Sequence, residues 1–181
     1  MSLLTPIPQR VAAATAVATA ITTAQAAQTA FAAKLDDLVD LLHPDEKIAA
    51  LEAVIRSETD VAAIQEAQNQ IAQVSANKDL ARETAIGLAR PTQSALYASL
   101  TALLTAALTE MNNLATEAQT AENAVFSAYG LPWEATAVTR RVNTYKAQLQ
   151  GMLTSLQSDL NRAGNLQLSR SAGTSILNWF S

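Results

Sequence analysis

Residues 10–42 read RVAAATAVATAITTAQAAQTAFAAKLDDLVDLL, and one set of side chains recurs along them at alternating steps of three and four. The positions concerned are Ala14, Val17, Ile21, Ala24, Gln28, Phe31, Leu35, Leu38 and Leu42. This spacing puts them on one face of an α-helix, as in helices that pack against other helices. The stretch therefore predicts one long amphipathic helix over residues 9–42.

The rest of the chain repeats this pattern between signals that start or stop a helix. Pro44 follows His43 and is placed to open a second helix, and residues 57–60 resemble a capping box that interrupts it. A further helix is expected from residue 61, with a weak point at residues 75–77, and Pro91 is expected to end it. Two long helices should follow over residues 92–129 and 132–163, separated by Gly130 as a C-terminal cap.

These elements predict an all-α fold, an elongated bundle of about five helices of which two or three are long and heptad-patterned. Residues 1–8 should form an extended N-terminal arm, because Pro6 and Pro8 oppose a regular helix there. Residues 9–164 form the helical bundle in this interpretation. Residues 165–181 are expected to be a loose C-terminal tail with an apolar anchor at its end.

The composition bears on the kind of function. Of the 181 residues, 49% are hydrophobic but only 4% aromatic, so thin helices in close contact are favoured over a thick globular core. The chain has no cysteine, which excludes disulfides and thiolate metal sites, and a single histidine, which excludes a metal centre with several histidines. We therefore expect no catalytic residue, no cofactor and no metal.

Two local motifs are candidates for carrying chemistry. Asp36, Asp37 and Asp40 spell DDxxD on a helix, and this pentapeptide resembles the magnesium-binding motif of terpene synthases and prenyltransferases. Leu35, Leu38, Val39 and Leu42 occupy the expected buried face, so the three acids are better explained as a solvated face. His43 could act as a general base, but the capping of a helix C-terminus is the better interpretation.

Charge is unevenly distributed. Residues 1–131 hold seven basic and fourteen acidic side chains, whereas residues 132–181 hold five basic and two acidic ones. A basic end and an acidic remainder suit head-to-tail packing of identical subunits or contact with an acidic neighbour, and Arg140 and Arg141 are the candidate residues. Nucleic-acid binding is disfavoured because the basic residues are sparse and the net charge is −4.

Three other segments are candidate interfaces. The arm presents Leu3, Leu4 and Ile7, which could lie on a neighbouring subunit. If the first helix forms a coiled coil between subunits, Gln28 would be a polar layer that fixes its register. The C-terminal end carries the apolar residues Ile176, Leu177, Trp179 and Phe180, which either dock in a groove of a partner or complete the core of this chain.

The function that these features favour is a non-enzymatic structural subunit of a large multi-subunit assembly. The composition resembles that of structural and internal virion proteins of tailed phages, which implies a head, neck, tail or internal component located in the virion after assembly in the host cytoplasm; a cytoplasmic location is the alternative. The alternatives are a self-assembling filament subunit, similar in composition to the helical parts of flagellins, and a phasin-like granule coat protein. Expected partners are copies of the chain and other structural subunits, with no small-molecule substrate, no nucleic acid and no membrane; the uncharged stretch at residues 91–109 is too polar for a membrane span.

Overall fold

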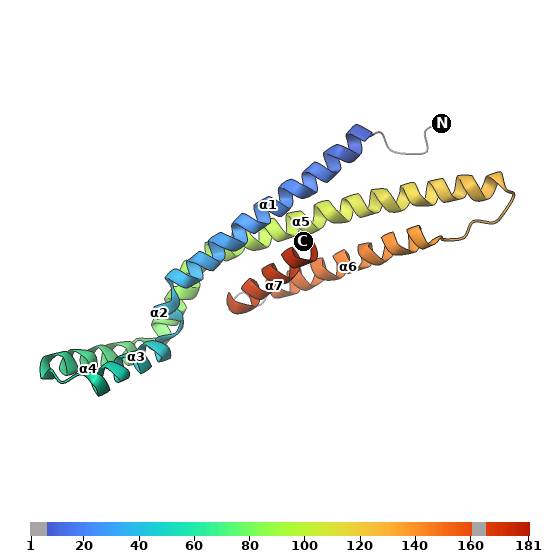
Figure 1. The fold of residues 1–181 in the computed structure, drawn as a ribbon. Helices are drawn as coiled ribbons and strands as arrows, with labels where there is room; N and C mark the ends of the chain where they lie inside the picture. Colours follow the sequence, from blue (N-terminus) through green and yellow to red (C-terminus); the bar gives the residue numbers. More distant parts are fainter. Residues whose placement is uncertain (1–6, 161–165) are drawn as a thin grey trace. The chain divides into compact units, whose positions relative to one another are not determined.

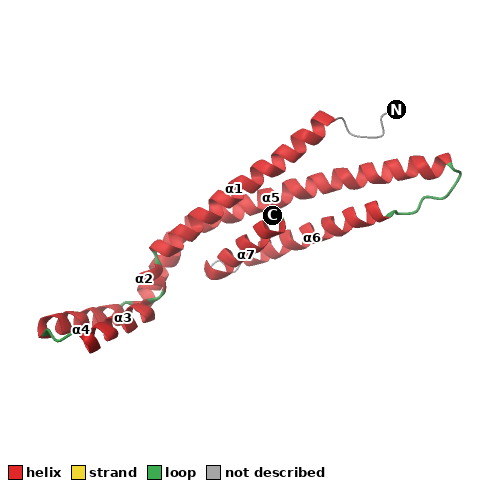
Figure 2. Cartoon of the chain, in the orientation of Figure 1, coloured by secondary structure: helices red, strands yellow, loops and turns green. Residues whose placement is uncertain are grey.

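The computed structural model describes residues 7–160 and 166–181, and its regular elements are all α-helices (Figures 1 and 2). The helices are α1 (Ile7–Asp37), α2 (Val39–Leu42), α3 (Pro44–Ser57), α4 (Val61–Ala76), α5 (Lys78–Ala128), α6 (Ala137–Leu160) and α7 (Leu166–Trp179). The all-α prediction is confirmed. Seven helices are found in the described residues where about five were expected.

The chain divides into two compact units. The first unit comprises Met1–Gln28 and Ala95–Ser181, and the second comprises Thr29–Ser94. The boundaries between the units therefore fall inside α1 and α5. Each unit has buried apolar side chains of its own, and each is described separately below.

The core of the first unit is built mainly on α5. Leu96, Leu100, Leu103 and Leu104 are fully buried there; the first three are spaced by four and three residues, and Leu104 follows directly. The other buried apolar residues of this unit are Ala24 in α1, Tyr97 and Ala107 in α5, Leu149 and Leu156 in α6, and Leu166 and Ile176 in α7. Leucine and alanine dominate this core, in keeping with close helix–helix contact.

The largest fully buried side chain of the second unit is Phe31. The other buried residues of this unit are Leu35, Leu38, Pro44, Ala67, Ala85, Ala89 and Gln93. Asp45 at the start of α3 ties that helix to α5, because its carboxylate lies 2.5 Å from the Lys78 ammonium and 3.0 Å from the Arg82 guanidinium. The hydrogen bond from Lys78 is the main cause that lowers the pKa of Asp45.

Several predicted helix boundaries are confirmed. Pro44 opens α3 as its first residue, and α4 ends at Ala76, with Asn77 as its C-cap. The break at residues 58–60 is also present, but the N-cap is Asp60, whose carboxylate accepts a hydrogen bond from the Ala62 N–H. The Glu58 carboxylate accepts from the N–H groups of Thr59 and Asp60 and so holds the turn.

Gly130 ends α5 as predicted, and its φ of 65° lies in the region that favours glycine. The Leu131 N–H donates to the Phe126 carbonyl and the Gly130 N–H to the Ser127 carbonyl, which together form a Schellman motif. The expectation that Pro132 opens the next helix is wrong. The next helix, α6, begins only at Ala137, because Thr136 is its N-cap and the Thr136 hydroxyl accepts from the Val138 N–H.

Pro91 does not end a helix, contrary to the prediction. Helix α5 runs through it without interruption. A proline lacks the N–H that would bond the carbonyl four residues earlier, so the helix continues at the cost of one backbone hydrogen bond. The apolar side chains that α5 buries before and after Pro91 stabilise the continuous helix and offset the loss of this hydrogen bond.

Both termini also differ from expectation where they are described. Helix α1 begins at Ile7, two residues earlier than predicted, and the rest of the expected arm lies outside the described residues. The expected loose tail is instead a helix over most of its length, α7. Its buried positions, Leu166, Ser169, Gly173 and Ile176, recur at steps of three and four, so small residues complete an amphipathic face.

Candidate assembly surfaces

The α7 helix is held within the first unit by a polar contact from α1. The Gln28 side-chain amide donates to the Arg170 carbonyl at 3.1 Å and to the Thr174 hydroxyl at 3.2 Å. Gly173 makes this approach possible, since a Cβ built on it would overlap the Gln28 side-chain amide. The Gln28 Oε1 atom is buried without a hydrogen-bond partner among the described residues. The structure thus gives Gln28 partners inside the chain, and a polar layer between subunits stays a prediction.

A second buried contact joins α7 to α5. The hydroxyls of Tyr97 and Ser169 lie 3.1 Å apart, and both side chains are buried. At the end of α7, the Trp179 ring meets Tyr145 of α6 edge-on with ring centroids 6.2 Å apart. Ile176 is buried as well. Ile176 and Trp179 thus make contacts inside this chain, and docking of the C-terminal end in a partner stays a prediction.

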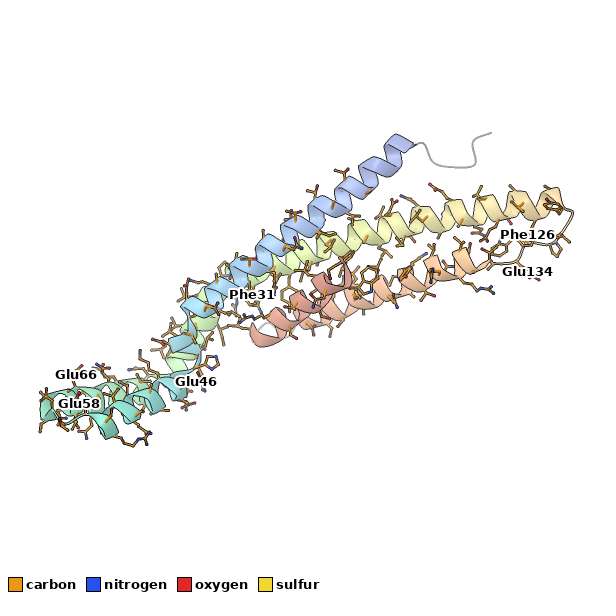
Figure 3. All side chains as sticks on the ribbon, in the orientation of Figure 1. Phe31, Glu46, Glu58, Glu66, Phe126 and Glu134 are labelled. Atoms are coloured by element: carbon orange, nitrogen blue, oxygen red, sulfur yellow. The ribbon has the colours of Figure 1, made fainter. Side chains whose placement is uncertain are left out.

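The loop between α5 and α6 is fastened to Glu122. Its carboxylate accepts hydrogen bonds from the Thr136 hydroxyl and, at 3.3 Å, from the Trp133 indole N–H. The bond from Thr136 is the largest of the contributions that lower the pKa of Glu122. This loop lies at one end of the α5–α6 hairpin, where Phe126 of α5 and Glu134 of the loop are labelled in Figure 3. No local sequence signal points to this role of Glu122, because its partners lie 11 and 14 residues further along the chain.

A groove of about 640 Å³ runs between α5 and α6 near this loop. Met111 and Leu114 line it from α5, and Val138, Val142 and Tyr145 line it from α6. Val138 is 61% exposed. Arg141 is the charged residue in the lining. We call this surface the α5–α6 groove.

Exposed apolar side chains concentrate at this end of the hairpin. Six of the eleven large apolar side chains that are exposed among the described residues lie between positions 125 and 145. They are Val125, Tyr129, Leu131, Trp133, Val138 and Tyr145. Along α5 the side chains of Leu96, Leu100, Leu103 and Leu104 are buried, whereas Val125 near the end of the helix and Tyr129 just after it are exposed. Such a gathering of apolar surface marks an interaction site more often than isolated exposed residues do.

Of the two basic residues predicted as interface candidates, Arg141 lines the groove, whereas Arg140 lines a separate hollow on α6 with Asn143, Thr144 and Ala147. Arg140 and Arg141 are exposed in the first turns of α6, and Lys146 follows one and a half turns later. Residues 137–158 hold these three basic side chains and no acidic one. Helix α6 thus presents positive charge next to apolar surface.

In the second unit, the turn between α3 and α4 exposes apolar side chains next to acidic ones. Val54 and Val61 are exposed there, Val61 at 77%. Glu58 and Asp60 lie in the turn between them, and Glu58 and Glu66 are seen at this end of the hairpin in Figure 3. Residues 44–76 hold six acidic and two basic side chains. We call this surface the α3–α4 turn.

The DDxxD motif and His43 do not assemble a site. In the described residues, no group of three or more His, Asp or Glu side chains is arranged to hold a metal ion. Asp40 is 3.3 Å from the Lys47 ammonium, and Asp36 and Asp37 are exposed. His43 is the C-cap of α2 by position, and its Nδ1 lies 3.3 Å from the Glu46 carboxylate.

The other predicted interface residues are placed as follows. Leu3 and Leu4 lie outside the described residues, and Ile7 is the first residue of α1. Leu177 and Phe180 are partly exposed near Trp179. The α5–α6 groove and the α3–α4 turn were missed, because a heptad pattern predicts which face is apolar and not whether the protein covers that face.

No family model, no curated protein and no solved structure matches this chain. Among the helices of residues 7–160 and 166–181, none combines the length and the apolar character needed to cross a bilayer.

Proposed function

We propose that this chain is a non-enzymatic structural subunit of a large multi-subunit assembly, a virion component of a tailed phage in the head, neck, tail or interior. The observation that carries the proposal is the exposed apolar surface at the end of the α5–α6 hairpin. Apolar surface of this kind is costly in water and is usually buried against a partner. Its natural partners are copies of the chain and other structural subunits.

Two further features support a structural role. The helices are rich in alanine and their polar faces in Thr and Gln, and only 15% of the residues are charged. A surface with so few charges is suited to permanent contact with neighbours. Obligate interfaces are in general more apolar and less charged than the rest of a protein surface.

The proposal is tested on the particle. Intact particles are purified on a density gradient from a phage lysate of the host that encodes the chain. Quantitative mass spectrometry of these particles should find the chain at a fixed number of copies per particle. Absence of the chain from intact particles would contradict a virion role. Polymers formed by the purified chain alone in particle-free samples would favour the filament alternative, and partition onto polyester granules would favour a phasin-like coat.

The same experiment tests the surface. Replacing Leu131 and Val138 with glutamine makes the hairpin end polar, and incorporation into particles should fall. The matched control replaces Leu80 and Leu88, which are similarly exposed apolar residues of α5 outside this surface, with glutamine. Incorporation of the control should be unchanged.

A further inference from the structure

We infer that helix α7 leaves its place on its own chain and binds at the same place on a second copy, so that two copies exchange their C-terminal helices. The α7 docking surface is formed by Gln28 of α1, Tyr97 of α5, and Tyr145 and Leu156 of α6. All of these residues belong to the first unit. The inference rests on the proposed function, because exchange needs copies that lie side by side, as subunits of an assembly do.

Little apolar surface holds α7 in place. Among the α7 side chains that the structure describes, the large apolar ones that are buried are Leu166 and Ile176. The other two buried positions are occupied by Ser169 and Gly173. Because the hydrophobic effect grows with the apolar area removed from water, these small residues add little to the binding of α7. Helix α5 of the same unit has four fully buried leucines and is held more firmly.

The polar contact between α1 and α7 is incomplete. The Gln28 amide donates to the Arg170 carbonyl and to the Thr174 hydroxyl, but its Oε1 atom is buried without a hydrogen-bond partner among the described residues. A buried acceptor without a partner raises the free energy of the docked state. Water reaches the amide when α7 leaves, so this cost favours release.

Packing between α6 and α7 is also incomplete. A hollow of about 230 Å³ lies between the two helices, and its lining includes Met152 and Ser155 of α6 and Ser171 and Ser175 of α7. Side chains that line a hollow lack van der Waals partners on one side. Three separate features thus weaken the docking of α7, and an element held in this way opens locally while the rest of the unit stays folded.

The α7 helix of a second copy fits the vacated surface because it has the same sequence. It restores the hydrogen bonds from Gln28, the contact between the Tyr97 and Ser169 hydroxyls, and the packing of Trp179 on Tyr145. Exchange of an identical element needs no new complementary surface, which makes it a low-cost route to dimers. By mass action, the exchanged form is favoured as the local concentration of copies rises.

Crosslinking of single-cysteine variants tests the exchange, since the chain has no cysteine of its own. Ser155 of α6 and Ser171 of α7 are exposed residues that line the same hollow. Full-length Ser155→Cys and Ser171→Cys chains are mixed at high concentration and treated with a short bis-maleimide. In an exchanged pair, one hollow contains a cysteine from each copy. The expected result is a linked dimer of the two variants in about tenfold excess over the linked dimers of either variant alone.

The matched control pairs Ser171→Cys with Ser127→Cys, because Ser127 is an exposed serine of α5 that does not line the hollow. This pair measures links formed by random collision. It should give no excess of the mixed dimer.

Hydrogen exchange of the wild-type chain at low concentration tests the release itself. Amides of α7 should exchange about tenfold faster than those of residues 96–104 in α5. In the Ser155→Cys/Ser171→Cys double variant, a link formed at high dilution joins α6 and α7 of one chain. Exchange of the α7 amides should then slow about tenfold relative to the same variant without the link.

The outcomes separate the exchange of α7 from the proposed function. Mixed dimers at the level of the Ser127→Cys control would overturn the exchange, and so would α7 amides that exchange as slowly as those of residues 96–104. An excess of mixed dimers together with fast exchange in α7 would establish it. Presence of the chain in the particle is measured independently, so its absence there would overturn the virion role and leave the crosslinking result as it stands.

Discussion

At the scale of single residues, the contact between Gly173 and Gln28 explains why a glycine stands inside a helix. Glycine in a helix interior lowers stability by roughly 0.5–1 kcal/mol relative to alanine. Gly173 is retained in α7 where the Gln28 amide occupies the space of a Cβ. At Gly151 of α6, by contrast, no neighbouring group lies within 4 Å of the position that a Cβ would take.

Gly151→Ala should therefore stabilise the protein by about 0.5–1 kcal/mol. Gly173→Ala should give no such gain, since it displaces the Gln28 amide and breaks two hydrogen bonds worth about 1 kcal/mol each. Chemical denaturation measures both changes. In the Gln28→Ala background, Gly173→Ala should raise the free energy of unfolding, because alanine is favoured over glycine in a helix and no amide is displaced. An increase of equal size in both backgrounds would contradict the contact between Gln28 and Gly173.

Glu122 leads to a prediction about pH. Its pKa is lowered in the folded chain, first by the hydrogen bond from Thr136, so its contribution to stability is present above the ordinary value of 4.5. That contribution is lost as the pH falls through the lowered pKa. Glu122→Gln should lower the melting temperature at pH 7, and the difference from wild type should shrink below pH 4.5. A difference that is the same at neutral pH and in strong acid would argue against a charged Glu122 as the anchor of the loop.

At the scale of helices, α5 shows where local sequence signals are overridden. Pro91 lies in its interior and is exposed. Pro91→Ala should restore one backbone hydrogen bond and raise the free energy of unfolding by about 1–3 kcal/mol. Pro132→Ala is the control, because Pro132 lies in the loop after α5, and it should change stability by less. Loss of stability in Pro91→Ala would show that the chain needs the proline at this position.

The helix boundaries show what sequence can predict. The boundaries at Pro44, Asn77 and Gly130 were predictable, because each depends on the backbone chemistry of one residue. The start of α6 was not, because it depends on Thr136 being held by Glu122 across the loop. Helix α7 was missed since Ser169 and Gly173 sit at its buried positions, where the heptad pattern is sought among larger apolar residues.

At the scale of the whole molecule, the division into two units leads to a prediction about local stability. Asp45 joins α3 to α5 within the second unit only. Asp45→Asn should accelerate hydrogen exchange of the amides in α3 and α4, because stability can be lost locally in one cooperative unit. Amides of α6 should keep their wild-type rates. Equal acceleration in α6 would show that the two units unfold as one.

The candidate surfaces were less predictable than the fold. The basic character of α6 could be read from the sequence. The concentration of exposed side chains near Leu131 and Val138 could not, since it depends on how far each helix is covered by its neighbours. For the same reason the sequence could not show that Gln28 has hydrogen-bond partners in α7.

The chain has only two tryptophans, and the structure places them at different sites of the first unit. Trp133 reports on the loop that Glu122 fastens, and Trp179 reports on the packing of α7 against Tyr145. Replacing either one with phenylalanine leaves a single tryptophan to dominate the fluorescence. The α5–α6 loop and the packing of α7 on α6 therefore each carry an optical probe, and the opening of the loop and the release of α7 are separately visible in solution without a label.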